Sequence, residues 1–145
     1  VSNWTTQRIE EANKFAEENG MEPIRISQIN YSLAHSSVET FGDNTLVCMD
    51  TKEFRWYKKH DFPVMAFSPQ AKGFFANLAR LAKVKQLSEQ TGDTPAKITL
   101  GYLNSQPFFV SSVFAVTKLW QLDEDMEAQD LTYDPKTVAF LENMI

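Results

Sequence analysis

The sequence contains a single cysteine, Cys48, among 145 residues. One thiol cannot form an intramolecular disulfide, and it cannot supply a zinc site built from several thiolates. Cys48 also has no matching base nearby in the sequence that would activate it as a nucleophile. We therefore expect an inert thiol and a reducing compartment, the cytoplasm.

The sequence also lacks a long apolar run and an excess of positive charge. No stretch reaches the roughly 20 apolar residues of a membrane-spanning helix, and the first residues show no basic region followed by an apolar core. The formal net charge of −5 argues against a general binder of the nucleic-acid backbone. We expect neither a membrane nor a nucleic-acid partner, whereas a local basic pocket for a phosphorylated cofactor stays compatible with this charge.

What is present is the composition of one soluble globular domain, with 43% hydrophobic and 23% charged residues. Helical and strand patterns alternate along the chain. Helices are predicted at residues 6–19, 49–60, 73–91, 96–105, 121–128 and 136–145, and strands at residues 24–31, 64–68 and 110–116. This alternation predicts an α/β fold with a parallel sheet, in which ligands bind at the carboxyl ends of the strands. Three full strands are fewer than the about eight of a closed parallel barrel, so we expect an incomplete sheet.

The first residues resemble the end of a strand that has no beginning in this sequence. Val1-Ser2-Asn3 has the character of a strand exit, and Thr5 and Thr6 supply hydroxyls that could cap the helix that follows. We therefore expect the sequence to begin in the middle of a sheet.

Polar side chains stand near the predicted strand ends. The amides of Asn3 and Gln28 each offer a donor and an acceptor, as a planar ligand with an amide group requires. Phe67 could stack on a flat ring, and Lys72 followed by Gly73 could approach a diphosphate. Each residue also has an ordinary interpretation, Phe67 as core and Asn3 as part of a turn, and both interpretations stay open at this point.

Several segments resemble, in order and with sensible spacing, the carboxyl-terminal half of an aldo-keto reductase. They are VSNW at residues 1–4, QINYSL at 28–33, VMAFSPQAKG at 64–73 and QLDED at 121–125. The resemblance implies a (β/α)8 TIM barrel that reduces aldehydes or ketones with NADPH or NADH. Residues 1–145 would then be one incomplete domain, a partial barrel with about three to four strands and flanking helices.

The resemblance also implies roles for individual residues. Ser2, Asn3 and Gln28 would bind the nicotinamide carboxamide, and Phe67 would stack on the nicotinamide where the family commonly has a tyrosine. Trp4 would border the substrate. The other cofactor-binding residues that it implies are Ser68, Gln70, Lys72 and Gly73 along the diphosphate, and Thr117, Lys118, Gln121 and Asp125 around the adenosine.

The last of these segments departs from the family pattern. Ala115 stands where a glycine is frequent, and Asp125 where an asparagine or serine is usual. Lys118 could serve a 2′-phosphate as a point charge, whereas Asp125 would repel one and would accept donors from adenine or ribose. The cofactor is therefore expected to be NADP(H) or NAD(H), with the choice between them open.

The family's catalytic tyrosine, lysine, aspartate and histidine lie on the first half of the barrel, and nothing in this sequence matches them. We therefore expect no catalytic residue and no metal site here, and the interpretation we favour is part of an oxidoreductase acting on small carbonyl compounds. One alternative is a free-standing half-barrel that binds nucleotides or another protein, with a homodimer covering the open sheet edges. A third is a degenerate relative with a purely structural role.

Overall fold

The computed structural model describes residues 1–73 and 77–144. Its centre is a three-stranded parallel sheet in the order β1 (Ser27–Asn30), β2 (Val64–Phe67) and β3 (Val110–Val113). The register aligns Gln28 with Met65 and Met65 with Ser111. The predicted parallel sheet is thus confirmed, with strands shorter than the patterns indicated.

The opening residues lie beside the free edge of β1. Ser2 forms a parallel bridge with Gln28, and the two segments exchange backbone hydrogen bonds of 2.8 Å, from Asn3 N to Gln28 O and from Gln28 N to Val1 O. The strand exit predicted from Val1-Ser2-Asn3 is therefore an isolated bridge beside β1, outside the three-stranded sheet.

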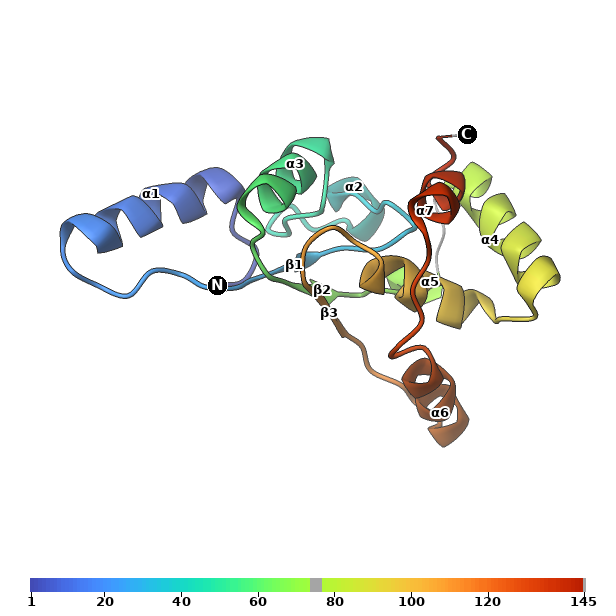
Figure 1. The fold of residues 1–145 in the computed structure, drawn as a ribbon. Coiled ribbons are helices and arrows are strands. Elements are labelled where there is room, and N and C mark those ends of the chain that lie inside the picture. The colour runs from blue at the N-terminus through green and yellow to red at the C-terminus, as the bar shows by residue number, and fades with distance from the viewer. Residues whose placement is uncertain (74–76, 145) are drawn as a thin grey trace.

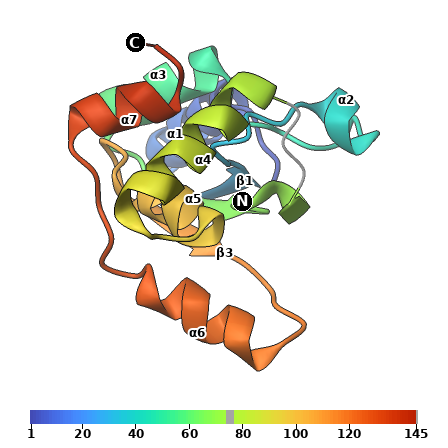
Figure 2. The ribbon, with the colours of Figure 1, turned by 90° about the vertical axis from the view of Figure 1, so that its right-hand side faces the viewer.

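The described part of the chain contains seven α-helices and one 3-10 turn in addition to the sheet. Figure 1 shows α3, α4 and α7 on one side of the sheet, and α6 projects away from them in both Figure 1 and Figure 2. None of the helices described is long and apolar enough to cross a membrane. The helices are α1 (Thr6–Glu18), α2 (Val38–Phe41), α3 (Thr51–His60), α4 (Leu78–Thr91), α5 (Pro95–Asn104), α6 (Leu119–Glu127) and α7 (Pro135–Leu141), and the 3-10 turn η1 spans Ala71–Gly73.

Side chains fix where most helices begin. Thr5, Asp50 and Thr94 each accept a hydrogen bond from a backbone N–H in the first turn of α1, α3 and α5. Pro95 and Pro135 occupy the first turns of α5 and α7, where a missing N–H costs nothing. The sequence therefore sets these boundaries locally, before tertiary packing.

The hydrophobic core lies between the helices and one face of the sheet. Ile29, Val64 and Ala66 are fully buried on that face, while Gln28 and Met65, on the opposite face, are only half-buried. The helices contribute the rest of the core, principally Tyr57, Val84, Ile98, Tyr102, Leu103 and Leu141. Among the described residues, helices thus cover one face of the sheet, and the other face is open.

The helix boundaries differ from the prediction in three places. The single turn α2 was expected to be a polar loop, because four residues carry no helical periodicity; its Ser37 and Thr40 form a capping box instead. The helix expected from residue 73 begins at Leu78, and residues 74–76 lie outside the described part of the chain. The last helix ends at Leu141, and the predicted final residue, Ile145, also lies outside that part.

Candidate functional site

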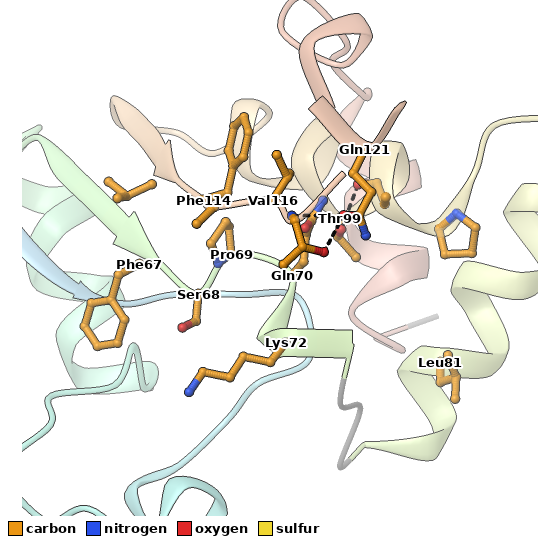
Figure 3. Close-up of a pocket in the computed structure, with 15 residues that line it drawn as sticks. Phe67, Ser68, Pro69, Gln70, Lys72, Leu81, Thr99, Phe114, Val116 and Gln121 are labelled. Carbon is orange, nitrogen blue, oxygen red and sulfur yellow. Dashed lines mark hydrogen bonds between the residues drawn. The ribbon is translucent and has the colours of Figure 1, made fainter. Parts of the chain in front are cut away.

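A cavity of about 840 Å³ lies where β2 and β3 end. The loop after β2, the segment after β3 and the start of α5 form its walls, and Figure 3 shows the side chains that line it. The lining residues are Phe67, Ser68, Pro69, Gln70, Lys72, Leu81, Pro95, Ala96, Thr99, Val113, Phe114, Ala115, Val116, Thr117 and Gln121. The cavity is therefore at the carboxyl ends of parallel strands, the edge at which ligands bind in open α/β sheets.

The loop after β2 has an unusual backbone. Ser68, Ala71 and Lys72 have φ angles of 49°, 50° and 54°, in the left-handed region that residues with a Cβ seldom adopt. Each such residue costs on the order of 1 kcal/mol or more, so surrounding contacts must hold the loop. One of these contacts is the hydrogen bond from Ala71 N to Ser68 O, at 2.9 Å. Backbone strain of this kind is concentrated at binding sites in other proteins.

A side-chain pair joins the two walls of the cavity. Gln70 Nε2 donates to Asp125 Oδ1 at 2.6 Å, which links the loop after β2 to α6. The Asp125 side chain is 4% exposed, and this burial raises the pKa of its carboxyl group, while the bond from Gln70 acts in the opposite direction. Asp125 thus contacts the cavity-lining residue Gln70, although Asp125 does not line the cavity itself.

The segment after β3 is held by one amide. Gln121 Oε1 accepts hydrogen bonds from Thr117 N at 3.2 Å, Thr117 Oγ1 at 3.3 Å and Lys118 N at 3.1 Å. The amide oxygen therefore satisfies two backbone donors in the segment just before α6, so these donors are not free for a ligand. Thr117 and Gln121 both line the cavity, whereas Lys118 is exposed and does not.

Lys72 is the one charged residue among the described residues that line the cavity. Its ammonium nitrogen lies 5.8 Å from the centre of the Phe41 ring, within the range of a cation–π interaction. Gly73 closes the 3-10 turn directly after it. A basic side chain and a tight turn at the mouth of a cavity are suited to an anionic group.

The predicted nicotinamide residues form a separate group at the edge of β1. Asn3 Oδ1 accepts from Val47 N at 3.0 Å, and Asn3 Nδ2 donates to Ser2 Oγ at 3.2 Å. Gln28 is the neighbour of Ser2 and lies half-buried on the open face of the sheet. The structure brings these three residues together, but they do not line the cavity.

Trp4 makes a different contact from the one expected. The guanidinium carbon of Arg8 lies 3.8 Å from the centre of its ring, so the indole is partly covered by a neighbour in α1. Trp4 does not line the cavity either.

The prediction missed the contribution of α5 to the cavity. Pro95, Ala96 and Thr99 line it, with Thr99 Oγ1 donating to Ala96 O at 2.8 Å. A threonine that bonds back to its own helix has no sequence signal that separates it from a packing residue. No group of three or more potential metal ligands occurs within the described residues.

Three comparisons relate the chain to known proteins. The sequence model described as the aldo/keto reductase family matches residues 1–145, whereas no curated protein matches the chain significantly. The solved structure of a thermostable aldo-keto reductase, in complex with the inhibitor epalrestat, is 19% identical with a TM-score of 0.73, and the match covers 100% of this chain and 47% of that one.

An aldo/keto reductase from Klebsiella pneumoniae in complex with NADP and acetate is 19% identical with a TM-score of 0.73, covering 99% of this chain and 46% of that one. The aldose reductase from Schistosoma japonicum is 17% identical with a TM-score of 0.66, covering 99% and 40%. The chain thus spans about half the length of these structures, and its sheet and helices are part of a TIM barrel. Since the family model matches all 145 residues, the chain belongs to the aldo/keto reductase family.

Proposed function

We propose that the chain is the carboxyl-terminal half of a nicotinamide-dependent oxidoreductase that reduces aldehydes or ketones, and that its cavity holds the cofactor. Two of the related solved structures, both from Klebsiella pneumoniae, contain NADP or NADPH. The observation that supports the proposal most is the position of the 840 Å³ cavity at the carboxyl ends of β2 and β3. Its lining includes six of the residues proposed from the sequence, namely Phe67, Ser68, Gln70, Lys72, Thr117 and Gln121.

The residues of the cavity fit the parts of a dinucleotide. Phe67, half-buried at the end of β2, offers a ring face to the nicotinamide. Lys72, together with the turn that ends at Gly73, suits the diphosphate. Thr117, in the segment after β3, supplies a hydroxyl and Gln121 an amide beside the adenosine. When bound, the nicotinamide supplies the hydride for carbonyl reduction.

In this proposal Ser2, Asn3 and Gln28 hold the carboxamide from the edge of β1. Asn3 Nδ2 already donates one hydrogen bond to Ser2 Oγ, so its second N–H is the one available to a ligand oxygen. The half-buried position of Gln28 on the open face of the sheet gives its amide access to the same region. Trp4 would border the substrate once Arg8 moves from its ring.

The proton donor of the reduction lies outside these 145 residues in this proposal. Tyr31, Tyr57 and Tyr102 are buried, and burial raises the pKa of Tyr57 to about 12. No tyrosine is among the described residues that line the cavity. This chain therefore binds and orients the cofactor, and the other half of the barrel supplies the acid.

The test is a fluorescence titration of the purified protein with NADPH and with NADH. Saturable binding of either dinucleotide, competed by its oxidised form, is the expected result. Absence of binding to both would refute the cofactor site. A second assay adds an aldehyde: if the 145-residue chain alone oxidised the dinucleotide at an ordinary enzymatic rate, the proposed division between the two halves would be wrong.

A further inference from the structure

The two ends of the cavity differ in charge. Lys72 stands at the loop after β2, while the opposite end is formed by the residues leading into α6. Figure 3 shows Lys72 and Gln121 on opposite sides of Gln70. The helix at that opposite end is strongly acidic, with Asp123, Glu124, Asp125 and Glu127 within its nine residues. An anionic ligand group is therefore attracted to one end and repelled from the other.

Asp125 is the acidic residue of α6 that is hydrogen-bonded to the cavity lining. Its carboxylate is buried and bonded to Gln70 Nε2, whose own side chain lines the cavity. Burial keeps water from screening this carboxylate, so its repulsion of a nearby phosphate is stronger than that of an exposed acid. The Gln70 amide, in turn, is occupied and is not free to donate the same hydrogen to a ligand.

Two backbone donors just before α6 are already occupied. The N–H groups of Thr117 and Lys118 donate to Gln121 Oε1, at 3.2 and 3.1 Å, so they are not free to bind a phosphate. The Lys118 side chain is solvent-exposed, as Lys72 is, but unlike Lys72 it does not line the cavity.

We propose that the α6 end of the cavity accepts an uncharged ribose and rejects a phosphorylated one, so that the protein binds NADH in preference to NADPH. This inference rests on the proposed function, which assigns the nicotinamide to Phe67 and the adenosine to Thr117 and Gln121. Asp125 is the specificity-determining residue, acting through its charge behind Gln70 and through its hydrogen bond to that cavity-lining amide. Adenine and ribose are rich in donors, which a carboxylate and an amide oxygen can accept.

The test compares the dissociation constants of NADH and NADPH for the protein, by fluorescence titration at low ionic strength. We expect NADH to bind about tenfold more tightly, the ratio that corresponds to one repulsive charge contact of modest strength. The preference should shrink in high salt. Equal affinities, or tighter binding of NADPH, would overturn the inference.

Two variants locate the effect. Asp125→Asn keeps the size of the side chain and removes its charge, so NADPH should bind about tenfold more tightly while NADH changes little. Asp123→Asn is the matched control, because it removes the same charge from an exposed position of the same helix outside the cavity. If both variants changed the ratio equally, the net charge of α6 and not Asp125 would set the preference.

The binding results distinguish a failure of the NADH preference from a failure of the proposed cofactor site. Binding of neither dinucleotide would contradict the cofactor site itself. Binding of both, with NADPH favoured, would leave the cofactor site intact and refute only the preference for NADH. The wild-type ratio decides this point even if Asp125→Asn proves unstable.

Discussion

Gln70 Nε2 and Asp125 Oδ1 lie 2.6 Å apart and join the loop after β2 to α6, 55 residues further along the chain. The loop contains three non-glycine residues with positive φ, so it needs an external restraint to keep that conformation. Helix α6 also needs an external restraint, because its residues Leu119 and Trp120 are 81% and 58% exposed and contribute little packing. This hydrogen bond therefore restrains both walls of the cavity, and the Lys97–Glu127 ion pair additionally ties α6 to α5.

Replacing Gln70 by leucine should loosen the loop and α6 together. The Asp125 carboxylate would be left buried without its donor, at a cost of about 1–3 kcal/mol. Amide hydrogen exchange should accelerate at residues 67–73 and within α6, but not in β1. Gln106→Leu is a control on an amide that bonds within its own region, Gln106 Nε2 to Tyr102 O. Unchanged exchange at α6 in Gln70→Leu would show that the pair is not a restraint.

The raised pKa of Asp125 predicts a pH dependence of stability. Burial favours the protonated carboxyl group in the folded protein, whereas the unfolded chain titrates near pH 3.9. The free energy of unfolding should therefore fall as the pH rises from about 4 through the pKa of Asp125 in the folded protein, because ionising this carboxyl group costs more there than in the unfolded chain. Urea denaturation at several pH values should show that Asp125→Asn lacks this contribution and gains stability relative to the wild type as the pH rises. A constant difference across pH would contradict the raised pKa.

Gly101→Ala should destabilise the protein even though alanine favours helices. A Cβ at Gly101, in α5, would lie 2.9 Å from Leu131 Cγ and 2.9 Å from Tyr133 Cε2. Such overpacking costs about 1–3 kcal/mol, against a helix-propensity gain of about 1 kcal/mol. Thermal denaturation measures the balance. Adding Leu131→Ala to Gly101→Ala removes the clashing side chain, so it should recover part of the lost stability. The same Leu131→Ala substitution in the wild-type protein should bring no such gain.

Glu53→Ala should weaken the attachment of α1 to α3, which the bond from Trp56 Nε1 to Glu10 Oε1 would still join. Glu53 is 4% exposed, and its Oε2 accepts from Thr6 N at 2.9 Å. Removing the carboxylate leaves a buried N–H without an acceptor, at a cost of about 1–3 kcal/mol in the free energy of unfolding. Glu53→Gln retains an acceptor and should lose less, and the exposed Glu17→Ala should be near neutral. Equal losses in Glu53→Ala and Glu17→Ala would mean that the bond contributes nothing.

Phe67→Ala should weaken NADH binding by about fivefold, the effect of losing one aromatic stacking partner. Phe67→Tyr keeps the ring and should bind as the wild type does. Phe109→Ala is the control, because Phe109 is 62% exposed and does not line the cavity. If Phe67→Ala bound NADH normally, the half-buried ring would be a packing residue only.

Much of the fold follows from local patterns in the sequence. The caps Thr5, Asp50 and Thr94 and the prolines at residues 95 and 135 mark helix starts that the structure confirms. The strands at Val64 and Val110 follow from short apolar runs. The turn α2 was missed because its Ser37–Thr40 capping box stabilises four residues that have no apolar stripe.

The site was harder to predict than the fold, because its contacts join distant segments. The sequence identifies Gln70 and Thr117 as polar residues near strand ends, the family resemblance adds Gln121, and all three line the cavity. The sequence does not show that Gln70 bonds to Asp125 or that the Gln121 amide binds the backbone just before α6, since both depend on side-chain geometry. The position of Thr99 in the cavity lining was missed for the same reason, because nothing in the sequence separates it from other small polar residues inside a helix.

The most direct test of the account is to map NADH binding onto the protein by the amide chemical shifts of the free and saturated states. The largest changes are expected at residues 67–73 and 113–121, the two walls of the cavity, with smaller changes at Gln28 and Asn3. Saturation with NADH that left both walls unchanged, or changed only residues elsewhere, would contradict the assignment of this cavity as the cofactor site.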